Sequence, residues 1–522
     1  MKKITRRKLI KNGAVAGAAG AAASIYSPLS SAALFVPTRR YRKKAVVVGS
    51  GFGGSVATLR LAEAGIETTL IERGKHWAFN GEGSYPTLGG TIGSLDGLAN
   101  IDDGLLWTEP GLLPGSVGML QEYVGGGIPI GLGAGLGGGS LVYGGVLLQP
   151  KREIFEQALP NLSYDDMDQV YYPKVLEKVS GGPIPDDILA SPNYTSMRIF
   201  IENATAAGLE VVRSEVGFNW DIIREEIEGL RNPYASVGEW IFGCNSGAKN
   251  TLDRNYLADA SATGKVEIRT LHNVTKIRKR PWNSEYEVHC EVLNENGKII
   301  ANHIFECQYL FMAAGSVHST RLLLKAKALW DIPGINDGVG EEWGSNGDEL
   351  KLRRGINAST APIQGGPPSI AAFDTNNPYK DTGFMHAPSH VVPEFAQLQM
   401  GMVIPDQNSR ATYNPLTDRL DVNWSKEANA NATNALNHTM EKMTAVGGGT
   451  VGTVVSNAGT WHPIGGAVMG VACSELGEVF GSPNLFVIDG ALIPGSTGAA
   501  NPSLTIAANA ERIMETLVNQ LV

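Results

Sequence analysis

A histidine and an asparagine near the carboxyl end of the chain are the residues best suited to carry chemistry. His462 lies in the stretch Trp461-His462-Pro463-Ile464-Gly465-Gly466, and Asn501 follows 39 residues later, just before Pro502. Imidazole titrates near neutral pH and can accept or donate a proton in a reaction. A carboxamide can stabilise charge that develops beside it. The turn after His462 favours an exposed ring over a core histidine, so the pair is predicted to be reactive.

The opposite end of the chain carries the pattern of an adenine-dinucleotide site. A β-branched run, Ala45 to Val48, leads into Gly49-Ser50-Gly51-Phe52-Gly53-Gly54, a helical stretch, and a second strand that ends at Glu72. Such glycines make the tight turn, admit the pyrophosphate and let helix and strand pack closely. The helix N-terminus attracts phosphate, and the acid binds ribose hydroxyls. All parts occur in order, which predicts a dinucleotide site. The acid at Glu72 disfavours the 2′-phosphate of NADP and leaves FAD or NAD.

A glycine-rich segment distinguishes between these two cofactors. Residues 131–145 read GLGAGLGGGSLVYGG, where leucine, valine and tyrosine interrupt a run of glycines. The apolar side chains predict a packed segment and not a flexible surface loop. Buried backbone with few side chains suits a large flat group, such as an isoalloxazine ring, and therefore favours FAD.

Two further segments are expected beside the cofactor. The strand and turn at residues 264–274 would lay Val274 against the adenine. The buried strand at residues 484–490 would place Asp489 and Gly490 beside the ribitol or the phosphates. With residues 309–316, these pieces predict a dinucleotide domain assembled from separated parts of the chain.

Size and composition indicate a globular protein of two closely packed domains. The chain has 522 residues, 43% of them hydrophobic and 18% charged. Its net charge of −9 argues against a nucleic-acid partner, whose phosphates require a basic face. None of the four cysteines forms a CxxC pair or stands at zinc-ligand spacing from a histidine. Free buried thiols and no metal site are therefore expected.

Residues 1–33 have the pattern of an export signal. Thr5-Arg6-Arg7-Lys8-Leu9 supplies twin arginines, a mildly apolar run follows, and Ser31-Ala32-Ala33 offers a cleavage site. The run is too short and too weakly apolar to span a bilayer, which needs about 20 apolar residues. We expect export by the twin-arginine route and a periplasmic or secreted mature protein.

Five blocks of the chain resemble the glucose-methanol-choline oxidoreductases, and among them the bacterial cholesterol oxidases with non-covalent FAD. The first block is the opening fingerprint. The others are GLGGGSLVYGGVLLQPKREIF from Gly135, TLDRNYLADASATGKVEIRTLHNVTKIR from Thr251, YLFMAAGSVHSTRLLLKA from Tyr309, and the tail from WHPIGG to ANPSLTIAANAERI. They span the chain in order from Lys44 to its last helix.

The resemblance implies an α/β fold with two domains. A Rossmann-like FAD-binding domain would comprise residues 41–150, 244–330 and 455–522. An α+β substrate domain, residues 151–243 and 331–454, would place a mixed sheet over the flavin.

The resemblance also implies roles for individual residues. His462 would position the hydroxyl of an alcohol or accept its proton, and Asn501 would direct its amide at the flavin or at developing charge. Residues expected at the FAD are Gly49, Gly51, Phe52, Gly53, Gly54, Glu72, Gly139, Tyr143, Gly144, Val146, Val274, Asp489, Gly490, Asn501 and Pro502. Tyr143 and Val146 replace an Asn and a Met of the family pattern, so redox tuning, oxygen access or substrate shape is expected to differ.

Cholesterol oxidases also use a glutamate to move the steroid double bond after oxidation. Glu394 is the only acid in the corresponding region, residues 384–404, and has apolar neighbours in Val391-Val392-Pro393-Glu394-Phe395. A mobile carboxylate suits proton transfer between two carbons. Glu394 is therefore the expected isomerisation base.

Three hypotheses follow for the function. The first is oxidation of a sterol 3β-hydroxyl to the ketone, with isomerisation to the 4-en-3-one and release of hydrogen peroxide from O₂. The second is a dehydrogenase of another bulky alcohol that passes electrons to a quinone or cytochrome. The third is a flavoprotein without catalysis. A sterol substrate would suit transient contact with a membrane surface, and the sequence leaves the oligomeric state open.

Overall fold

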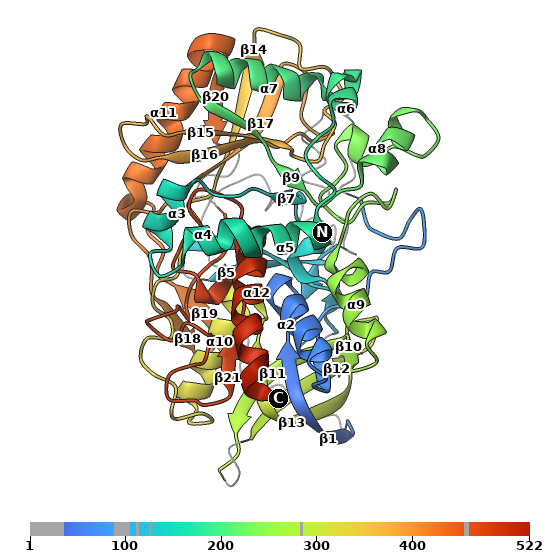
Figure 1. Ribbon diagram of the computed structural model, residues 1–522, viewed down its shortest axis with the longest axis vertical. Coiled ribbons are helices and arrows are strands. Elements are labelled where there is room, and N and C mark those ends of the chain that lie inside the picture. Colours follow the sequence, from blue (N-terminus) through green and yellow to red (C-terminus); the bar gives the residue numbers. More distant parts are fainter. Residues whose placement is uncertain (1–35, 88–104, 111–113, 126, 282–284, 454–458) are drawn as a thin grey trace, which may run out of the picture.

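The computed structural model describes residues 36–522, apart from residues 88–104, 111–113, 126, 282–284 and 454–458. The expected export signal, residues 1–33, lies outside the described residues. Two β-sheets occupy the two ends of an elongated molecule (Figure 1).

The first sheet has seven strands and lies in the lower half of Figure 1. Its order is β10 (Val266–Arg269), β2 (Thr68–Ile71), β1 (Thr38–Val48), β13 (Ile299–Met312), β12 (Tyr286–Leu293) and β11 (His272–Lys279), and β21 (Leu485–Val487) pairs with the end of β13. β10, β2, β1, β13 and β21 run parallel, whereas β12 and β11 pair antiparallel. The sheet is therefore mixed.

Apolar strands and helices on either side bury the parallel centre of this sheet. Ala45, Val46 and Val47 in β1 are fully buried, as expected of a parallel strand covered on both faces. α2 (Phe52–Glu63) follows β1 directly and packs against α12 (Pro502–Leu521) and α9 (Tyr256–Ala262). α10 (Gly315–Ala328) follows β13 in the same way.

A buried ion pair joins α2 to α12. Arg60 donates from Nε and Nη2 to the two carboxylate oxygens of Glu511 at 2.7 Å each. Lys174 and Tyr256 also contact this carboxylate, at 3.0 and 2.9 Å. Both helices run downward in Figure 1, and the two residues lie at similar depths within them. The N-termini of α2 and α12 therefore lie at the same level, at the boundary between the two halves of the molecule.

The second sheet has six strands and lies in the upper half of Figure 1. Its order is β20 (Gly448–Thr453), β14 (Glu349–Ile356), β17 (Ala396–Val403), β16 (Thr382–His386), β15 (Ile370–Asp374) and β8 (Glu210–Arg213). All five pairings are antiparallel, whereas a mixed sheet was expected here. The short connections between β15, β16 and β17 explain the difference, because parallel neighbours need a long crossover.

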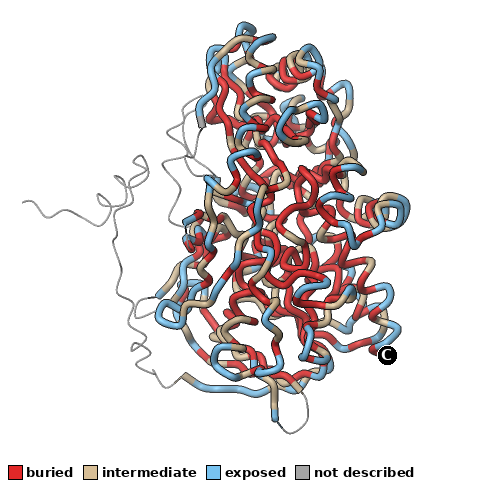
Figure 2. The backbone as a smooth tube through the Cα atoms, turned by 90° about the vertical axis from the view of Figure 1, so that its left-hand side faces the viewer, coloured by how far each residue is buried: buried red, intermediate tan, exposed pale blue. Residues whose placement is uncertain are grey.

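Two helices cover the outer face of this second sheet. α7 (Thr195–Ala206) and α11 (Ala430–Gly447) pack on the outer face, where Phe200 stacks on Phe384 with ring centroids 6.3 Å apart. The opposite face packs against the first half of the molecule through a cluster that includes Met385, Met402 and Ala500. Figure 2 shows buried backbone passing from one half to the other.

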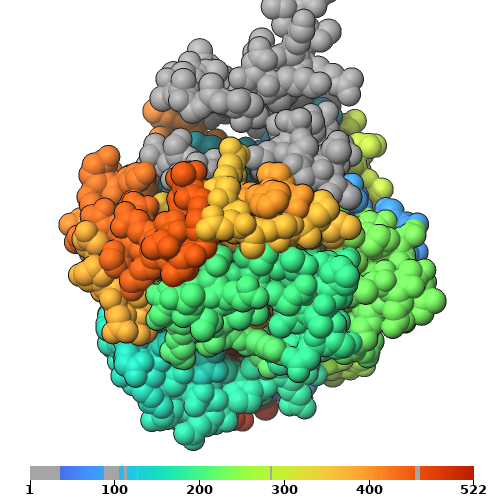
Figure 3. Space-filling model, turned by 90° about the horizontal axis from the view of Figure 1, so that it is seen from above, coloured from blue at the N-terminus to red at the C-terminus, as the bar shows by residue number. Residues whose placement is uncertain are grey.

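Shorter elements complete the two halves. They are α3 (Arg152–Ala158), α4 (Tyr164–Asp166), α5 (Tyr172–Val179), α6 (Asp186–Ala190), α8 (Trp220–Ile227), and the pairs β3 (Trp107–Thr108) with β4 (Ser116–Val117), β5 (Leu120–Gly125) with β6 (Ile128–Gly133), β7 (Val146–Leu147) with β9 (Glu215–Val216), and β18 (Ala411–Asn414) with β19 (Arg419–Val422). Seen from above, green segments between residues 150 and 243 lie beside yellow and orange ones after residue 331 (Figure 3).

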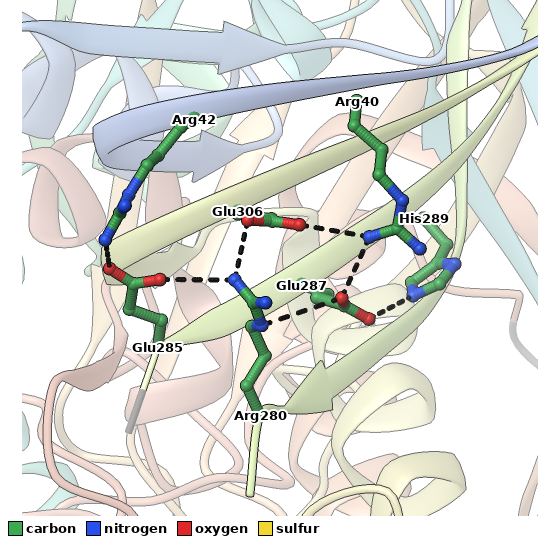
Figure 4. Close-up of polar contacts among 7 residues, drawn as sticks. All are labelled: Arg40, Arg42, Arg280, Glu285, Glu287, His289 and Glu306. Atoms are coloured by element: carbon green, nitrogen blue, oxygen red, sulfur yellow. Dashed lines mark hydrogen bonds and ion pairs between the residues drawn. The ribbon is translucent and has the colours of Figure 1, made fainter. Parts of the chain in front are cut away.

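Ion pairs between charged side chains link β1 to the hairpin of β12 and β13 (Figure 4). Arg40 Nη1 contacts Glu287 at 3.1 Å and Glu306 at 3.0 Å, and Arg280 contacts Glu306 at 2.6 Å. Arg42 pairs with Glu285 at 2.5 Å. The arginines lie toward solvent, so this network is a surface feature of the first sheet.

The structure shows the state of the cysteines and the character of the described helices. All four cysteines are buried and free, as expected. Among the described residues, no helix has the length and apolar character that crossing a bilayer requires.

Candidate active site

The glycines of the fingerprint fill positions where a side chain would collide with backbone. Gly49 has φ +102°, and a Cβ added to it would lie 2.2 Å from the carbonyl oxygen of Ala313. An added Cβ would lie 1.6 Å from the oxygen of Ile488 at Gly53, and 2.0 Å from the oxygen of Gly49 at Gly54. These three glycines therefore let α2 lie against the ends of β1, β13 and β21.

Two other glycines face open space. No heavy atom lies within 4 Å of a Cβ added to Gly51 or to Gly139. The two positions are close to each other, because a Cβ on Gly138 would lie 2.7 Å from Cα of Gly51. Gly51 precedes the first turn of α2, whose free N–H groups attract phosphate. This bare backbone suits a pyrophosphate and a flat ring that approach it closely.

Glu72 connects the fingerprint to the glycine-rich segment. Its Oε2 accepts hydrogen bonds from N and Oγ of Ser50 at 3.2 and 2.6 Å, and its Oε1 accepts one from N of Gly74 at 2.9 Å. The hydroxyl of Ser50 also accepts a hydrogen bond from N of Gly137 at 3.0 Å. The carboxylate is therefore fixed at the tip of β2, the position that binds ribose in this kind of fold.

A buried lysine fixes the residues around Tyr143. Lys249 Nζ donates to the carbonyl oxygens of Leu141, Tyr143 and Ile241 at 3.3, 2.8 and 2.9 Å. Burial lowers the pKa of Lys249 to about 7. The ring of Tyr143 contacts Phe52 of α2, with centroids 5.6 Å apart. Both residues predicted from sequence thus lie side by side next to the open glycines.

The remaining predicted cofactor residues lie around the ends of the parallel strands. Val274 is buried in β11, Val146 is buried in β7, and Gly144 lies next to the ring of Trp240. Asp489 accepts hydrogen bonds from N of Gly315, Oγ of Ser319 and N of Ala491, at 2.8, 2.6 and 2.8 Å. Its carboxylate fixes the start of α10, which leaves the backbone of Asp489 and Gly490 for the predicted contact.

His462 is held by a carboxylate that the sequence analysis missed. Nδ1 of His462 lies 2.9 Å from Oδ1 of Asp348, whose side chain has no exposed surface. Thr460 donates its hydroxyl to Oδ2 of Asp348 at 2.8 Å and accepts a hydrogen bond from N of His462 at 2.9 Å. The second ring nitrogen, Nε2, is left for a substrate. This arrangement can accept a proton at one atom.

Asn501 is the N-cap residue of α12 and has an unsatisfied oxygen. Its Oδ1 is buried and has no hydrogen-bond partner within the described part of the chain. Pro502 follows at the first helical position, where its missing N–H costs nothing. A buried amide oxygen without a partner is costly, and such groups are found where a ligand supplies the partner.

One short segment positions both predicted reactive residues. Asp348 contacts His462, while Asn346 donates from Nδ2 to the carbonyl oxygen of Ala500 at 2.9 Å, directly before Asn501. Asn346 and Gly347 both have positive φ, at +58° and +67°. The tight turn Ser345-Asn346-Gly347-Asp348 therefore presents two side chains in different directions. Turn residues directly before a strand are the only sequence signal that could have identified it.

The face of the second sheet that is turned toward this site is apolar. Side chains alternate along a strand, so Leu350 and Leu352 of β14 share the face of Met385 and Met402. Register pairs Leu350 with Met400 and Leu352 with Leu398. Leu350, Leu398 and Met400 are partly exposed, whereas Met385 and Met402 are buried against Ala499 and Ala500. We call this surface the apolar wall: Leu350, Leu352, Leu398 and Met400.

The structure does not bring Glu394 to His462. Ile356, at the far end of β14, donates its N–H to the carbonyl oxygen of Phe395, while Asp348 precedes the near end of the same strand. At about 3.4 Å per residue, the two ends are separated by roughly 25 Å. Glu394 is exposed and accepts a hydrogen bond from Oγ of Ser359. The expected place of Glu394 beside the reacting groups is therefore corrected: it lies in a turn at the outer end of the second sheet.

Comparison with protein families identifies the fold. A family model described as GMC oxidoreductase matches residues 7–328, and its C-terminal counterpart matches residues 404–510. The chain belongs to the GMC oxidoreductases. Pyridoxine 4-oxidase from Mesorbium loti has the same fold, with a TM-score of 0.60 and 16% identity over 91% of this chain and 98% of that one.

The curated relatives of this GMC oxidoreductase oxidise different alcohols. A cholesterol oxidase of Mycobacterium tuberculosis is 26% identical over 90% of this chain and 89% of its own. A paromamine 6'-oxidase of Streptomyces fradiae is 23% identical over 91% of each chain. A long-chain-alcohol oxidase of Arabidopsis thaliana is 23% identical over 92% of this chain and 68% of its own. These similarities show that this chain is an alcohol-oxidising enzyme of the GMC family.

GMC oxidoreductases use FAD, and the residues of this chain fit it. Gly51 and Gly139 leave the backbone bare where pyrophosphate and ring must approach, and Glu72 lies at the ribose position. Oδ1 of Asn501 has no hydrogen-bond partner among the residues that the structure describes, which leaves it available to a bound group. The N-termini of α2 and α12 lie at the same level, and the N–H of Gly465 donates to the carbonyl oxygen of Gly490 at 2.9 Å. The fingerprint and the predicted reactive pair therefore lie in one region of the molecule.

Proposed function

We propose that this GMC oxidoreductase oxidises the hydroxyl group of a bulky apolar alcohol, a 3β-hydroxysterol, to the ketone. The FAD is held without a covalent bond, and O₂ takes up the electrons and leaves as hydrogen peroxide. The apolar wall is the observation that supports a bulky apolar substrate. An aminoglycoside or a pyridoxine would expose several polar groups to Leu350, Leu398 and Met400 without a partner, which is unfavourable.

His462 is the base of the proposed reaction. When its Nδ1–H donates to Asp348, Nε2 carries a lone pair and can accept the proton of the substrate hydroxyl. The buried carboxylate then stabilises the imidazolium that forms, as an aspartate does for the histidine of a catalytic triad. When bound, FAD supplies the acceptor for the hydride of the carbon that bears the hydroxyl.

Asn501 and the wall position the substrate for that step. Asn501 sits at the N-terminus of α12, where the helix dipole favours negative charge. The wall runs along β14 from a point two residues beyond Asp348, so an apolar body laid on it carries its hydroxyl end toward His462. Contact with the wall also excludes water, which strengthens the hydrogen bonds of His462.

The proposed reaction does not include isomerisation by Glu394. That residue is exposed in a turn at the far end of β14 and cannot reach a product held at His462. The proposed product of a 5-ene sterol is therefore the 5-en-3-one.

Anaerobic mixing of the purified flavoprotein with cholesterol, a long-chain primary alcohol and paromamine tests the proposal. We expect bleaching of the flavin absorbance with the sterol and recovery of colour in air, with one peroxide formed per turnover. Bleaching by paromamine alone would contradict the sterol proposal. Bleaching by the sterol without recovery in air, but with turnover on an artificial quinone, would favour a dehydrogenase over an oxidase.

We also propose that the protein is exported through the twin-arginine route and acts in the periplasm or outside the cell. The pattern Thr5-Arg6-Arg7-Lys8-Leu9 supports this. Replacing both arginines by lysine should retain the protein in the cytoplasm of the host, which cell fractionation measures. Export of the doubly substituted chain at an unchanged level would contradict the proposal.

A further inference from the structure

The apolar wall contains the one accessible methionine among the described residues. The chain has twelve methionines, and Met1 lies outside the described part. Ten of the others are buried, with at most 5% of their surface exposed. Met400 alone is partly exposed. Thioether oxidation follows access, so the fold singles out one methionine for attack by an oxidant.

Met400 lies where an oxidant released at the active site would meet it. It pairs in register with Leu350 on β14 and with Met385 on β16. Leu350 is two residues from Asp348, which holds His462, and Met385 packs in the cluster that contains Ala499 and Ala500. Met400 therefore lies on the part of the apolar wall that is next to the segments positioning His462 and Asn501. An apolar substrate is proposed to lie on this wall.

We propose that Met400 is a modification site: hydrogen peroxide oxidises it before any other described methionine, and its oxidation weakens binding of the apolar substrate. The peroxide comes from the oxidase reaction proposed above, so this proposal rests on that function. In this step the sulfur of Met400 gains one oxygen atom from H₂O₂, the O–O bond breaks, and water leaves. Methionine becomes the sulfoxide, and the peroxide is reduced.

The consequence for binding follows from the polarity of the product. A sulfoxide is polar, and here it would face Leu350 and Leu398, which offer no hydrogen bond from their side chains. An apolar substrate laid on the wall would cover the sulfoxide oxygen and remove it from water. We expect the KM for a sterol to rise about fivefold or more, because a buried polar group without a partner is costly. His462 and Asp348 are unchanged, so kcat should change little.

Peptide mass spectrometry after peroxide treatment of the resting holoenzyme tests the site. One tryptic peptide, residues 381–410, contains Met385, Met400 and Met402, so two buried methionines serve as internal controls. We expect the sulfoxide at Met400 first, with a parallel rise in KM, and recovery of KM on treatment with methionine sulfoxide reductases. Oxidation of Met385 or Met402 as fast as Met400 would overturn the inference, and so would oxidation of Met400 without a change in KM.

A second arm separates this inference from the proposed function. The enzyme is allowed to turn over a sterol in air, with catalase present to remove peroxide from bulk solution. Sulfoxide at Met400 in both arms supports the site and the oxidase. Sulfoxide after added peroxide but not after turnover supports the site and shows that peroxide formed in turnover leaves before it reacts with Met400, whereas turnover without O₂ uptake would contradict O₂ as the acceptor. Met400→Leu conserves the apolar volume and should keep its KM through peroxide treatment. If it loses affinity as the wild type does, Met400 is not the cause.

Discussion

Nδ1 of His462 lies 2.9 Å from Oδ1 of Asp348, a carboxylate whose side chain is completely buried. Asp348 belongs to the turn that starts the second sheet, whereas His462 follows more than 100 residues later in the chain. The contact therefore couples the base of the reaction to the sheet that bears the substrate. Its geometry assigns the proton of the neutral ring to Nδ1 and the lone pair to Nε2.

Asp348→Asn should abolish most of the activity without loss of the fold. The amide can donate its own N–H to Nδ1, which moves the ring proton to Nε2, the atom that must accept the substrate proton. We expect the rate of anaerobic flavin reduction to fall about 10²–10⁴-fold, with little change in substrate affinity. Stopped-flow absorbance measures both quantities.

Asp348→Glu is the matched variant, because it restores the carboxylate with a longer side chain. Partial recovery of the reduction rate in Asp348→Glu would support positioning by charge. An Asp348→Asn enzyme that reduces its flavin at the wild-type rate would show that the contact has no part in the reaction.

Glu394→Gln should leave both rate and product unchanged. Glu394 is exposed, contacts Ser359 and lies at the far end of β14 from Asp348. With a 5-ene sterol, we expect the wild type and the variant to release the 5-en-3-one equally. Absorbance of the conjugated enone, a chromophore that the 5-en-3-one lacks, follows isomerisation. Rapid enone formation by the wild type that is lost in Glu394→Gln would return Glu394 to the mechanism.

Local patterns predict the local geometry of the fingerprint, because its residues are adjacent in sequence. Gly49, Gly51 and Gly54 belong to one turn whose geometry their spacing dictates. Family resemblance then predicts His462 and Asn501 as the reactive pair, and the helices α2 and α12, which both run downward in Figure 1, bring Asn501 to the level of the fingerprint.

Contacts across distant segments could not be derived in this way. Asp348 reaches His462 only because β14 begins beside the turn at residues 460–464, and the turn residues before β14 do not indicate which distant segment they will contact. Glu394 was chosen as the only acid of its region, but position along a strand decides whether a side chain reaches the site. The antiparallel pairing of the second sheet likewise depends on strand order.

Stability should fall as the pH drops from about 6.5 to 4. Burial lowers the pKa of His386 to about 3 and lowers the pKa of His318 well below its ordinary value. The unfolded chain takes up protons near pH 6.5 while these folded rings stay neutral, so stability is complete above that pH and is lost below it. Each ring contributes up to about 1.4 kcal/mol per pH unit.

Urea unfolding at pH 7.5, 6.0 and 5.0 measures this dependence. His386→Gln is the control, because an amide can keep a hydrogen bond to Ser196 but does not titrate. The slope of unfolding free energy against pH should be shallower in the variant. Equal free energies for the wild type at the three pH values would contradict the prediction.

Arg60→Gln should destabilise the protein strongly and weaken its hold on FAD. Glu511 has no exposed surface, and Arg60 supplies two of its hydrogen bonds. Burial would raise the pKa of Glu511, but the hydrogen bonds and charge of Arg60 bring it below its ordinary value. Without Arg60, a buried carboxylate loses its main partner, which costs about 3 kcal/mol. The same pair aligns α2 with α12, so FAD affinity should fall as well.

Arg42→Gln is the matched control, because it makes the same chemical change in an exposed pair. Arg42 is 73% exposed and contacts Glu285 in the network of Figure 4. Such surface pairs contribute little to stability, because water and salt screen them and because fixing two long side chains costs entropy. Thermal and urea unfolding of both variants, with FAD retention measured after dialysis, compares the two sites. Equal losses in the two variants would mean that the buried pair does not align the helices, and the convergence of Gly51 and Asn501 would then depend on apolar packing alone.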